Sequence, residues 1–162
     1  MSSASELQVV EFGLGNEVFA IPVALVREIL DYTPPSYLPN GPAHFIGLTD
    51  LRGQGVPTVD FRRRLGLPSV DPTLATRILI LDVRLPDRLL TLGVVIDRVL
   101  SVTSFEKAEI EPAPDIGISW NSEYITGVVR RNTGFVVIVD AARIFTTEDA
   151  IGIGSEGQLV NA

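Results

Sequence analysis

The stretch FIGLTDLRGQGVPTVDFRRRL, residues 45–65, contains the local signals that decide the fold. Two apolar segments flank the sequence LRGQG, and glycine can adopt positive φ, so the stretch predicts a β-hairpin. Asp60 follows the second segment and precedes three arginines. An aspartate at this position accepts hydrogen bonds from the free N–H groups of a first helical turn, so it predicts a short, capped helix.

This unit occurs twice in the chain. A shift of 80 residues aligns it without a gap with ITGVVRRNTGFVVIVDAARIF, residues 125–145, so that Asp60 meets Asp140. A shift of 73 residues places IPVALVREI on VVIDRVLSV, so that Val26 meets Val99 and Ile29 meets Val102. Two matches in the same order predict two copies of one β-unit.

The remaining segments also favour strands. They are short, rich in Val, Ile, Leu and Phe, and bounded by Gly, Pro, Asn or Asp, which predicts about ten strands. GLGNE, residues 13–17, predicts a hairpin turn, whereas the spacing of VALVREIL, residues 23–30, predicts a helix. We therefore expect a mainly β protein of two small barrels packed side by side, with a few short helices and a groove at their junction.

Composition excludes several classes of protein. The 162 residues are 46% hydrophobic and 20% charged, which is typical of a globular domain. The absence of cysteine excludes disulfides and thiolate metal sites, and the net charge of −7 argues against nucleic-acid binding. Apolar segments stay shorter than the roughly 18 residues that cross a bilayer. The N-terminus lacks signal-peptide features, so we expect a cytosolic protein without membrane insertion.

Catalytic signals are weak. His44 is the only histidine, no serine lies in a G-x-S-x-G context, and a histidine metal site would need more ligands. The repeat explains Asp60 and Asp140 better as helix caps than as paired carboxylates. We expect no enzymatic activity, no cofactor and no metal. Arg52 has two interpretations, a polar turn residue or an exposed docking residue, and the pattern alone favours neither.

The sequence resembles the CheW-type adaptors of bacterial chemotaxis over residues 6–146. The motifs that carry the resemblance stand in the family order: FGLGNEVFAIPVALVREIL, FIGLTDLRGQGVPTVDFRRRLGLP, TRILILDV, LGVVIDRVLSV, YITGVV and FVVIVDAARIF. The chain departs from the usual pattern at Asp50, where Asn is common, and at Phe61, where Leu is common.

The resemblance implies a fold and a division of the chain. It implies one CheW-like domain over 6–146, built from two five-stranded SH3-like β-barrel subdomains. Their approximate bounds are 17–72 and 73–146, and the N-terminal strand is assigned to neither. Residues 1–5 and 151–162 are expected to be flexible tails.

The resemblance also implies a non-catalytic adaptor. Such proteins couple the cytoplasmic tips of chemoreceptors to the histidine kinase CheA, and they pair with its CheW-like regulatory domain and with other CheW-like domains in rings. Val26, Glu28 and Ile29 match the receptor-binding segment, and Arg52 and Gly53 match the turn that couples kinase and receptor.

Other functions remain open. The same scaffold could serve a pilus-linked or other chemosensory pathway, and a ligand-binding double barrel or a small enzyme using His44 are further alternatives. The arginines at 62–64 read better as a solvated helix face than as a partner contact.

Overall fold

The computed structural model describes residues 5–37, 45–112 and 124–145. His44, the predicted tail 151–162 and most of the predicted tail 1–5 lie outside the described residues. The described part contains ten strands, as predicted: β1 (Glu6–Leu14), β2 (Glu17–Pro22), β3 (Val26–Asp31), β4 (Phe45–Leu51), β5 (Gln54–Asp60), β6 (Arg77–Arg84), β7 (Leu89–Ile96), β8 (Arg98–Glu106), β9 (Ile125–Arg131) and β10 (Gly134–Val139). The helical elements are α1 (Phe61–Arg64), α2 (Ala141–Ile144), and the 3₁₀ turns η1 (Val23–Leu25) and η2 (Lys107–Glu109).

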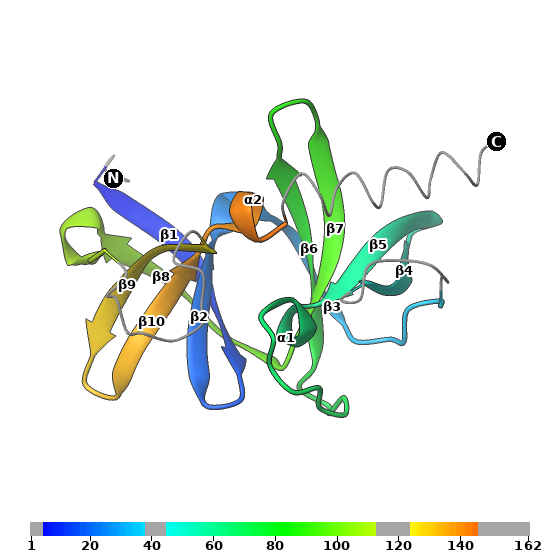
Figure 1. The fold of residues 1–162 in the computed structure, drawn as a ribbon, viewed down its shortest axis with the longest axis horizontal. Helices are drawn as coiled ribbons and strands as arrows, with labels where there is room; N and C mark the ends of the chain where they lie inside the picture. The colour runs from blue at the N-terminus through cyan, green and yellow to red at the C-terminus, as the bar shows by residue number, and fades with distance from the viewer. Residues whose placement is uncertain (1–4, 38–44, 113–123, 146–162) are drawn as a thin grey trace.

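The strands form two five-stranded sheets that lie side by side (Figure 1). Sheet A has the order β8-β1-β2-β10-β9, and sheet B has the order β3-β6-β7-β5-β4. Each sheet combines antiparallel hairpins with one parallel pair, β2 with β10 and β5 with β7. The mainly β architecture of two five-stranded units with few short helices is confirmed.

The two orders match strand for strand through the sequence repeat. The hairpin β4–β5 followed by α1 corresponds to the hairpin β9–β10 followed by α2, and β3 corresponds to β8. Neither copy of the repeat coincides with one sheet, because each copy contributes strands to both sheets. The predicted subdomains 17–72 and 73–146 likewise each contribute strands to both sheets. Sheet B consists of one continuous segment, β3 to β7, and sheet A is assembled from the strands on either side of that segment.

The predicted turns and caps are present. Leu14 pairs with Glu17 across the β1–β2 turn, which confirms the hairpin at GLGNE. The Asp60 carboxylate accepts a hydrogen bond from the Arg62 N–H at 3.0 Å, and the Asp140 carboxylate accepts one from the Arg143 N–H at 3.2 Å. Both aspartates therefore cap helices, as the repeat predicted.

The helix predicted over 23–30 is wrong. Only η1 is helical, and the chain continues as β3, which pairs antiparallel with β6. Short apolar segments satisfy helical and strand periodicity equally well, and here the ladder to β6 pairs five of the six residues of β3. Val26 and Ile29 are β-branched, which also favours a strand.

The core has three parts. The largest cluster lies between the two sheets and includes the stacked and tilted rings of Phe12, Phe19, Phe61 and Phe145. A smaller cluster belongs to each sheet. Residues of β6 alternate between the cluster of sheet B and the cluster between the sheets, so the strand is buried on both faces. This double burial accounts for the nearly continuous apolar sequence of β6.

Candidate partner-binding site

Arg52 lies at the tip of the β4–β5 hairpin in a left-handed conformation. Its φ is 50° and that of Gly53 is 87°, which suits a two-residue hairpin turn. The Asp50 carboxylate accepts a hydrogen bond from the Gly53 N–H at 2.8 Å. Asp50 therefore stabilises the turn itself.

The partner of Arg52 is Glu28 on β3. Arg52 Nη1 and Nη2 donate to the two Glu28 oxygens at 2.8 and 2.7 Å. The Arg52 side chain is 70% exposed and that of Glu28 is 30% exposed. The hydrogen bonds from Arg52 lower the pKa of Glu28. Because β3 is an outer strand of sheet B and Arg52 directly follows β4, the other outer strand, the pair joins one edge of that sheet to the β4–β5 turn.

Ile29 and Val26 differ in burial. Ile29 is 42% exposed and stands opposite Leu79, which belongs to the core between the sheets. Directly opposed residues of an antiparallel pair share a face, so Ile29 lies on the face of sheet B that is turned toward sheet A. Val26 is half-buried and packs against that core. Val26 therefore contributes to stability as well as to the surface.

The sequence interpretation missed Val99 and Val102 on β8. Val102 is 65% exposed and stands opposite Val10, which belongs to the core between the sheets. Val99 is half-buried and packs against the same core. These residues are the repeat partners of Ile29 and Val26, so the 73-residue shift already contained the signal that could have identified them.

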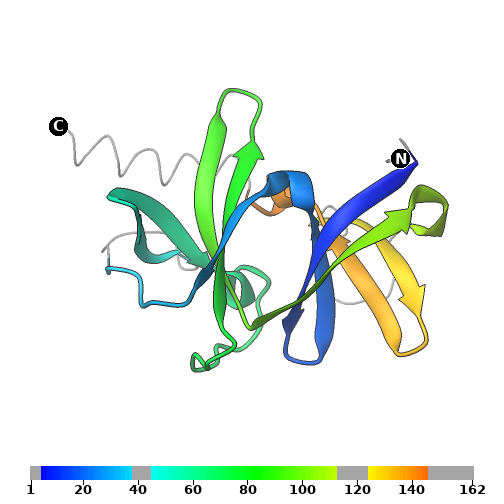
Figure 2. The same ribbon diagram turned by 180° about the vertical axis from the view of Figure 1, so that it is seen from behind.

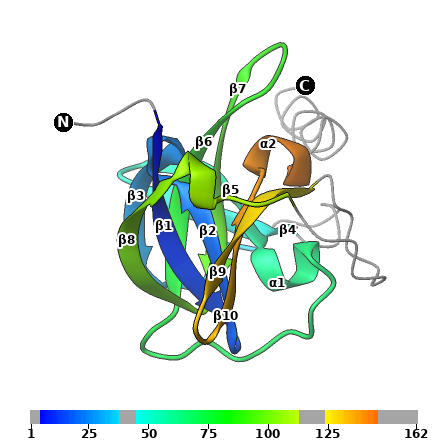
Figure 3. The same ribbon diagram turned by 90° about the vertical axis from the view of Figure 1, so that its left-hand side faces the viewer.

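The two edge strands bring these four residues to one side of the molecule. Figure 2 shows β3 of sheet B and β8 of sheet A on the near side of the molecule, where the two sheets adjoin. Figure 3 shows β3 and β8 on the opposite side of the molecule from α1 and α2. We define the β3/β8 strip as Val26, Ile29, Val99 and Val102. Both sheets contribute residues to the strip. Glu28 lies between Val26 and Ile29 in the sequence, but it stands opposite Ile80 of the sheet B cluster, so its side chain is on the other face of β3.

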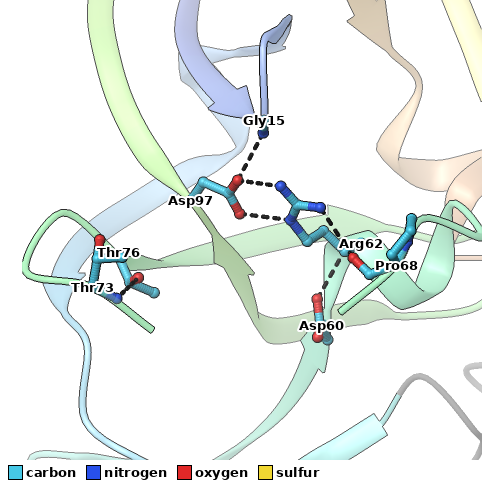
Figure 4. A network of polar contacts seen from close by, with 7 residues as sticks. All are labelled: Gly15, Asp60, Arg62, Pro68, Thr73, Thr76 and Asp97. Atoms are coloured by element: carbon cyan, nitrogen blue, oxygen red, sulfur yellow. Dashed lines mark hydrogen bonds and ion pairs between the residues drawn. The ribbon is translucent and has the colours of Figure 1, made fainter. Parts of the chain in front are cut away.

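Arg62 is not on a solvated face, contrary to expectation. Its side chain is 12% exposed, and Nε and Nη2 donate to the Asp97 carboxylate at 2.9 and 2.5 Å (Figure 4). Asp97 also accepts the N–H of Gly15 at 2.7 Å. The hydrogen bonds from Arg62, with that of Gly15, lower the pKa of Asp97 despite its burial.

A pocket of about 410 Å³ lies beside this network. Its polar lining includes Asp60, Arg62, Thr76 and Asp97. These groups already have partners in the protein, as the Thr76 hydroxyl does by accepting the Thr73 N–H at 2.8 Å (Figure 4). These four groups are therefore engaged in contacts that hold the fold together.

Within the described ranges, no group of three or more His, Cys, Asp or Glu residues is arranged to hold a metal ion. No helix in that same part of the chain is long and apolar enough to cross a membrane.

Comparisons with known proteins identify the family. The sequence profile of the CheW-like domain matches residues 8–149. The chemotaxis protein CheW of Rhizobium meliloti is 28% identical over 142 residues, which cover 88% of this chain and 89% of that protein. The CheW of Klebsiella aerogenes is 30% identical over 138 residues, covering 85% and 81%.

The same fold occurs in a solved structure. The scaffolding protein TtCheW of Thermoanaerobacter tengcongensis superposes with a TM-score of 0.76 at 21% identity, covering 88% of this chain and 94% of that one. The two five-stranded units are accordingly SH3-like subdomains. The family profile spans most of the chain, and the chain belongs to the CheW-like domain family, a family of non-catalytic chemotaxis scaffolds.

Proposed function

We propose that this chain couples the cytoplasmic tips of chemoreceptors to a CheA-type histidine kinase in receptor arrays at the inner face of the membrane. The observation that carries the proposal is the pair of exposed apolar residues, Ile29 and Val102, at equivalent positions of the two sheets. The similarity to proteins named as chemotaxis CheW, which covers more than four fifths of each chain, supports it.

The β3/β8 strip is proposed as the receptor-binding surface. Single exposed apolar residues are common on protein surfaces, but equivalent residues on two neighbouring sheets offer a partner more than one anchor. The half-buried Val26 and Val99 pack against the core, and the exposed Ile29 and Val102 supply apolar area that a partner can bury. An apolar side-chain row on a receptor segment would complement it.

Arg52 and Gly53 are proposed to couple receptor and kinase. The hydrogen bonds to Glu28 hold the guanidinium in one orientation and leave donors for a partner carboxylate or carbonyl. Gly53 gives the turn its shape without a side chain, and a Cβ added there would meet open space, so a partner can approach the backbone. Glu28 is therefore a positioning residue for Arg52 in this proposal.

The kinase contact is proposed to run through the CheW-like regulatory domain of the CheA-type kinase. A related domain would present a similar pair of barrels, so head-to-tail pairing of one barrel with the other barrel of the next domain would build rings, with other CheW-like domains as further members. Which chemosensory pathway uses the chain, flagellar or pilus-linked, depends on the receptors and kinases that it binds.

Receptor-tip binding tests the strip. Ile29→Ala and Val102→Ala should each weaken binding of a receptor-tip fragment by about tenfold or more, as truncation of a central interface anchor does. Leu74→Ala is the matched control, because Leu74 is exposed and apolar but lies outside the strip. Wild-type binding by both folded strip variants would overturn the assignment. A pull-down against the host's kinases and receptors would identify the pathway.

A further inference from the structure

The two equivalent helices differ in the side chains that they present. The repeat aligns Arg62 of α1 with Ala142 of α2, and Arg64 with Ile144. The repeat therefore gives α2 no counterpart of either guanidinium. Any role of these arginines is specific to the α1 side of the molecule.

Arg64 connects α1 to elements that belong with sheet A. Its Nε donates to the carbonyl of Ile144 in α2 at 2.8 Å, and its Nη2 donates to the Tyr124 hydroxyl at 3.0 Å. The guanidinium carbon lies 4.9 Å from the Tyr124 ring centroid. Tyr124 is itself fixed to the β10–α2 junction, because its carbonyl accepts the Asp140 N–H at 2.8 Å.

Arg62 makes the second connection. Asp97 is the single residue between β7 of sheet B and β8 of sheet A, and it accepts hydrogen bonds from Arg62 and from Gly15 in the β1–β2 turn. Arg62 also donates to the Pro68 carbonyl at 3.0 Å. One guanidinium therefore ties α1 to the crossing point of the chain and, through Asp97, to a turn of sheet A.

These polar connections and the β3/β8 strip lie on opposite sides of the molecule. α1 and α2 occupy one side, whereas β3 and β8 occupy the other (Figure 3). The apolar core between the sheets lies between them, and apolar contact by itself is non-directional. Directional bonds on the helix side can therefore define the angle at which the two sheets meet.

We propose that Arg62 and Arg64 are positioning residues that hold the two sheets at the angle at which the β3/β8 strip matches its receptor partner, an inference that rests on the proposed function of the strip. Loosening either connection allows the sheets to turn about the core. Ile29 and Val102 then change their spacing, because they belong to different sheets.

Spin-label distances test the angle directly. The chain has no cysteine, so a Gln54→Cys and Asn132→Cys pair places one label on an exposed hairpin residue of each sheet. Arg62→Ala and Arg64→Ala should broaden or shift the distance distribution measured by pulsed EPR on the folded protein. They should also weaken receptor-tip binding by about tenfold, through lost preorganisation.

Arg63→Ala is the matched control, because Arg63 lies between the two and pairs with the cap of its own helix, Asp60, at 3.7 Å. It should leave distances and binding unchanged. Tyr124→Phe keeps the ring and removes the acceptor of Arg64, so it should produce a smaller change in distance even if an alanine variant fails to fold. Arg64→Lys should restore part of the binding.

The outcomes separate the two proposals. Unchanged distance distributions in folded Arg64→Ala and Tyr124→Phe proteins would overturn the positioning role, whatever receptor-tip binding the strip variants show. A lower melting temperature with an unchanged distribution and unchanged binding would also overturn it, because that result describes a merely stabilising contact. Altered distances with wild-type binding by both Ile29→Ala and Val102→Ala would instead refute the strip as the receptor surface.

Discussion

Glu11 on β1 and Arg131 at the end of β9 form an ion pair inside sheet A at the place where sheet B has Ile80 and Leu51. The Glu11 side chain is 2% exposed and that of Arg131 is 37% exposed. Arg131 Nη1 donates to Glu11 Oε1 at 2.7 Å, and Nη2 donates to the second oxygen. Arg131 and Leu51 occupy equivalent positions through the 80-residue shift, and Glu11 and Ile80 occupy equivalent positions through the strand registers of the two sheets. One barrel thus uses charge where its counterpart uses apolar contact.

The burial of this pair predicts unequal effects for its two single substitutions. Arg131→Leu leaves a buried carboxylate without its partner and should lower the free energy of unfolding by about 3 kcal/mol. Glu11→Ile should cost less, because the partly exposed Arg131 can turn toward water. The double variant, which copies sheet B, should lie within about 1 kcal/mol of wild type or above it. Urea unfolding measures all three.

Arg130→Leu is the control for that series. Arg130 pairs with Glu111 at 2.6 Å on the surface, so its loss should cost less than about 1 kcal/mol. Equal costs for Arg131→Leu and Glu11→Ile, or additive costs in the double variant, would refute a coupled buried pair.

The same pair predicts a pH dependence. Burial raises the pKa of Glu11, but hydrogen bonds from Arg131 and Thr103 outweigh it, and the net pKa is lowered. The unfolded chain therefore binds more protons than the native protein, and stability rises with pH. This contribution is complete above the unfolded glutamate pKa of about 4.3 and is lost as pH falls through the lower native value. The free energy of unfolding should thus fall more between pH 7 and pH 3 in wild type than in the Glu11→Ile/Arg131→Leu double variant. Parallel curves would show that Glu11 contributes nothing to acid sensitivity.

Substitution of Arg52 should abolish coupling without disturbing the fold. Arg52→Glu places a second carboxylate beside Glu28, but both side chains reach water, so the melting temperature should change little. Receptor-controlled kinase activity, reconstituted with receptor and kinase, should be lost. Arg52→Lys should be intermediate, because it keeps the charge and loses the bidentate geometry.

The charge-swapped variant Glu28→Arg/Arg52→Glu distinguishes a partner contact from a local one. It restores an ion pair at the hairpin tip but removes the guanidinium from position 52. We expect coupling to stay lost. Full coupling by the swapped protein would reduce Arg52 to a residue that merely fastens β3 to the β4–β5 turn.

Gly47 should not tolerate a side chain. Its φ is 145°, and an added Cβ would lie 2.1 Å from the Ser36 carbonyl oxygen, where Ser36 bridges to Leu48. Gly47→Ala should therefore lower the free energy of unfolding by about 2 kcal/mol or more. Gly55→Ala is the control, because its Cβ would make only an ordinary 3.5 Å contact. Equal melting temperatures for the two variants would contradict this account.

Local chemistry predicted much of the fold. Asp60 and Asp140 cap their helices, GLGNE forms a hairpin turn, and the short apolar segments form strands, because each of these features depends on neighbours in the sequence. The segment 23–30 was misread because its state depends on pairing with β6, a long-range contact.

The sites were only partly predictable for the same reason. Val26, Glu28, Ile29, Arg52 and Gly53 came from the family resemblance, and their role in binding remains a prediction. The pairing of Arg52 with Glu28 depends on two edge strands of one sheet meeting, and that of Arg62 with Asp97 depends on how two sheets meet. Neither distance follows from residue spacing.

The nesting of sheet B within sheet A affects the order in which a growing chain can fold. Every strand of sheet B has been synthesised once Ile96 leaves the ribosome, whereas sheet A still needs β8, β9 and β10. β1 and β2 are made first, yet they gain their outer neighbours last. Until then their apolar residues are open to wrong partners, so the earliest strands depend on the latest ones for protection from aggregation.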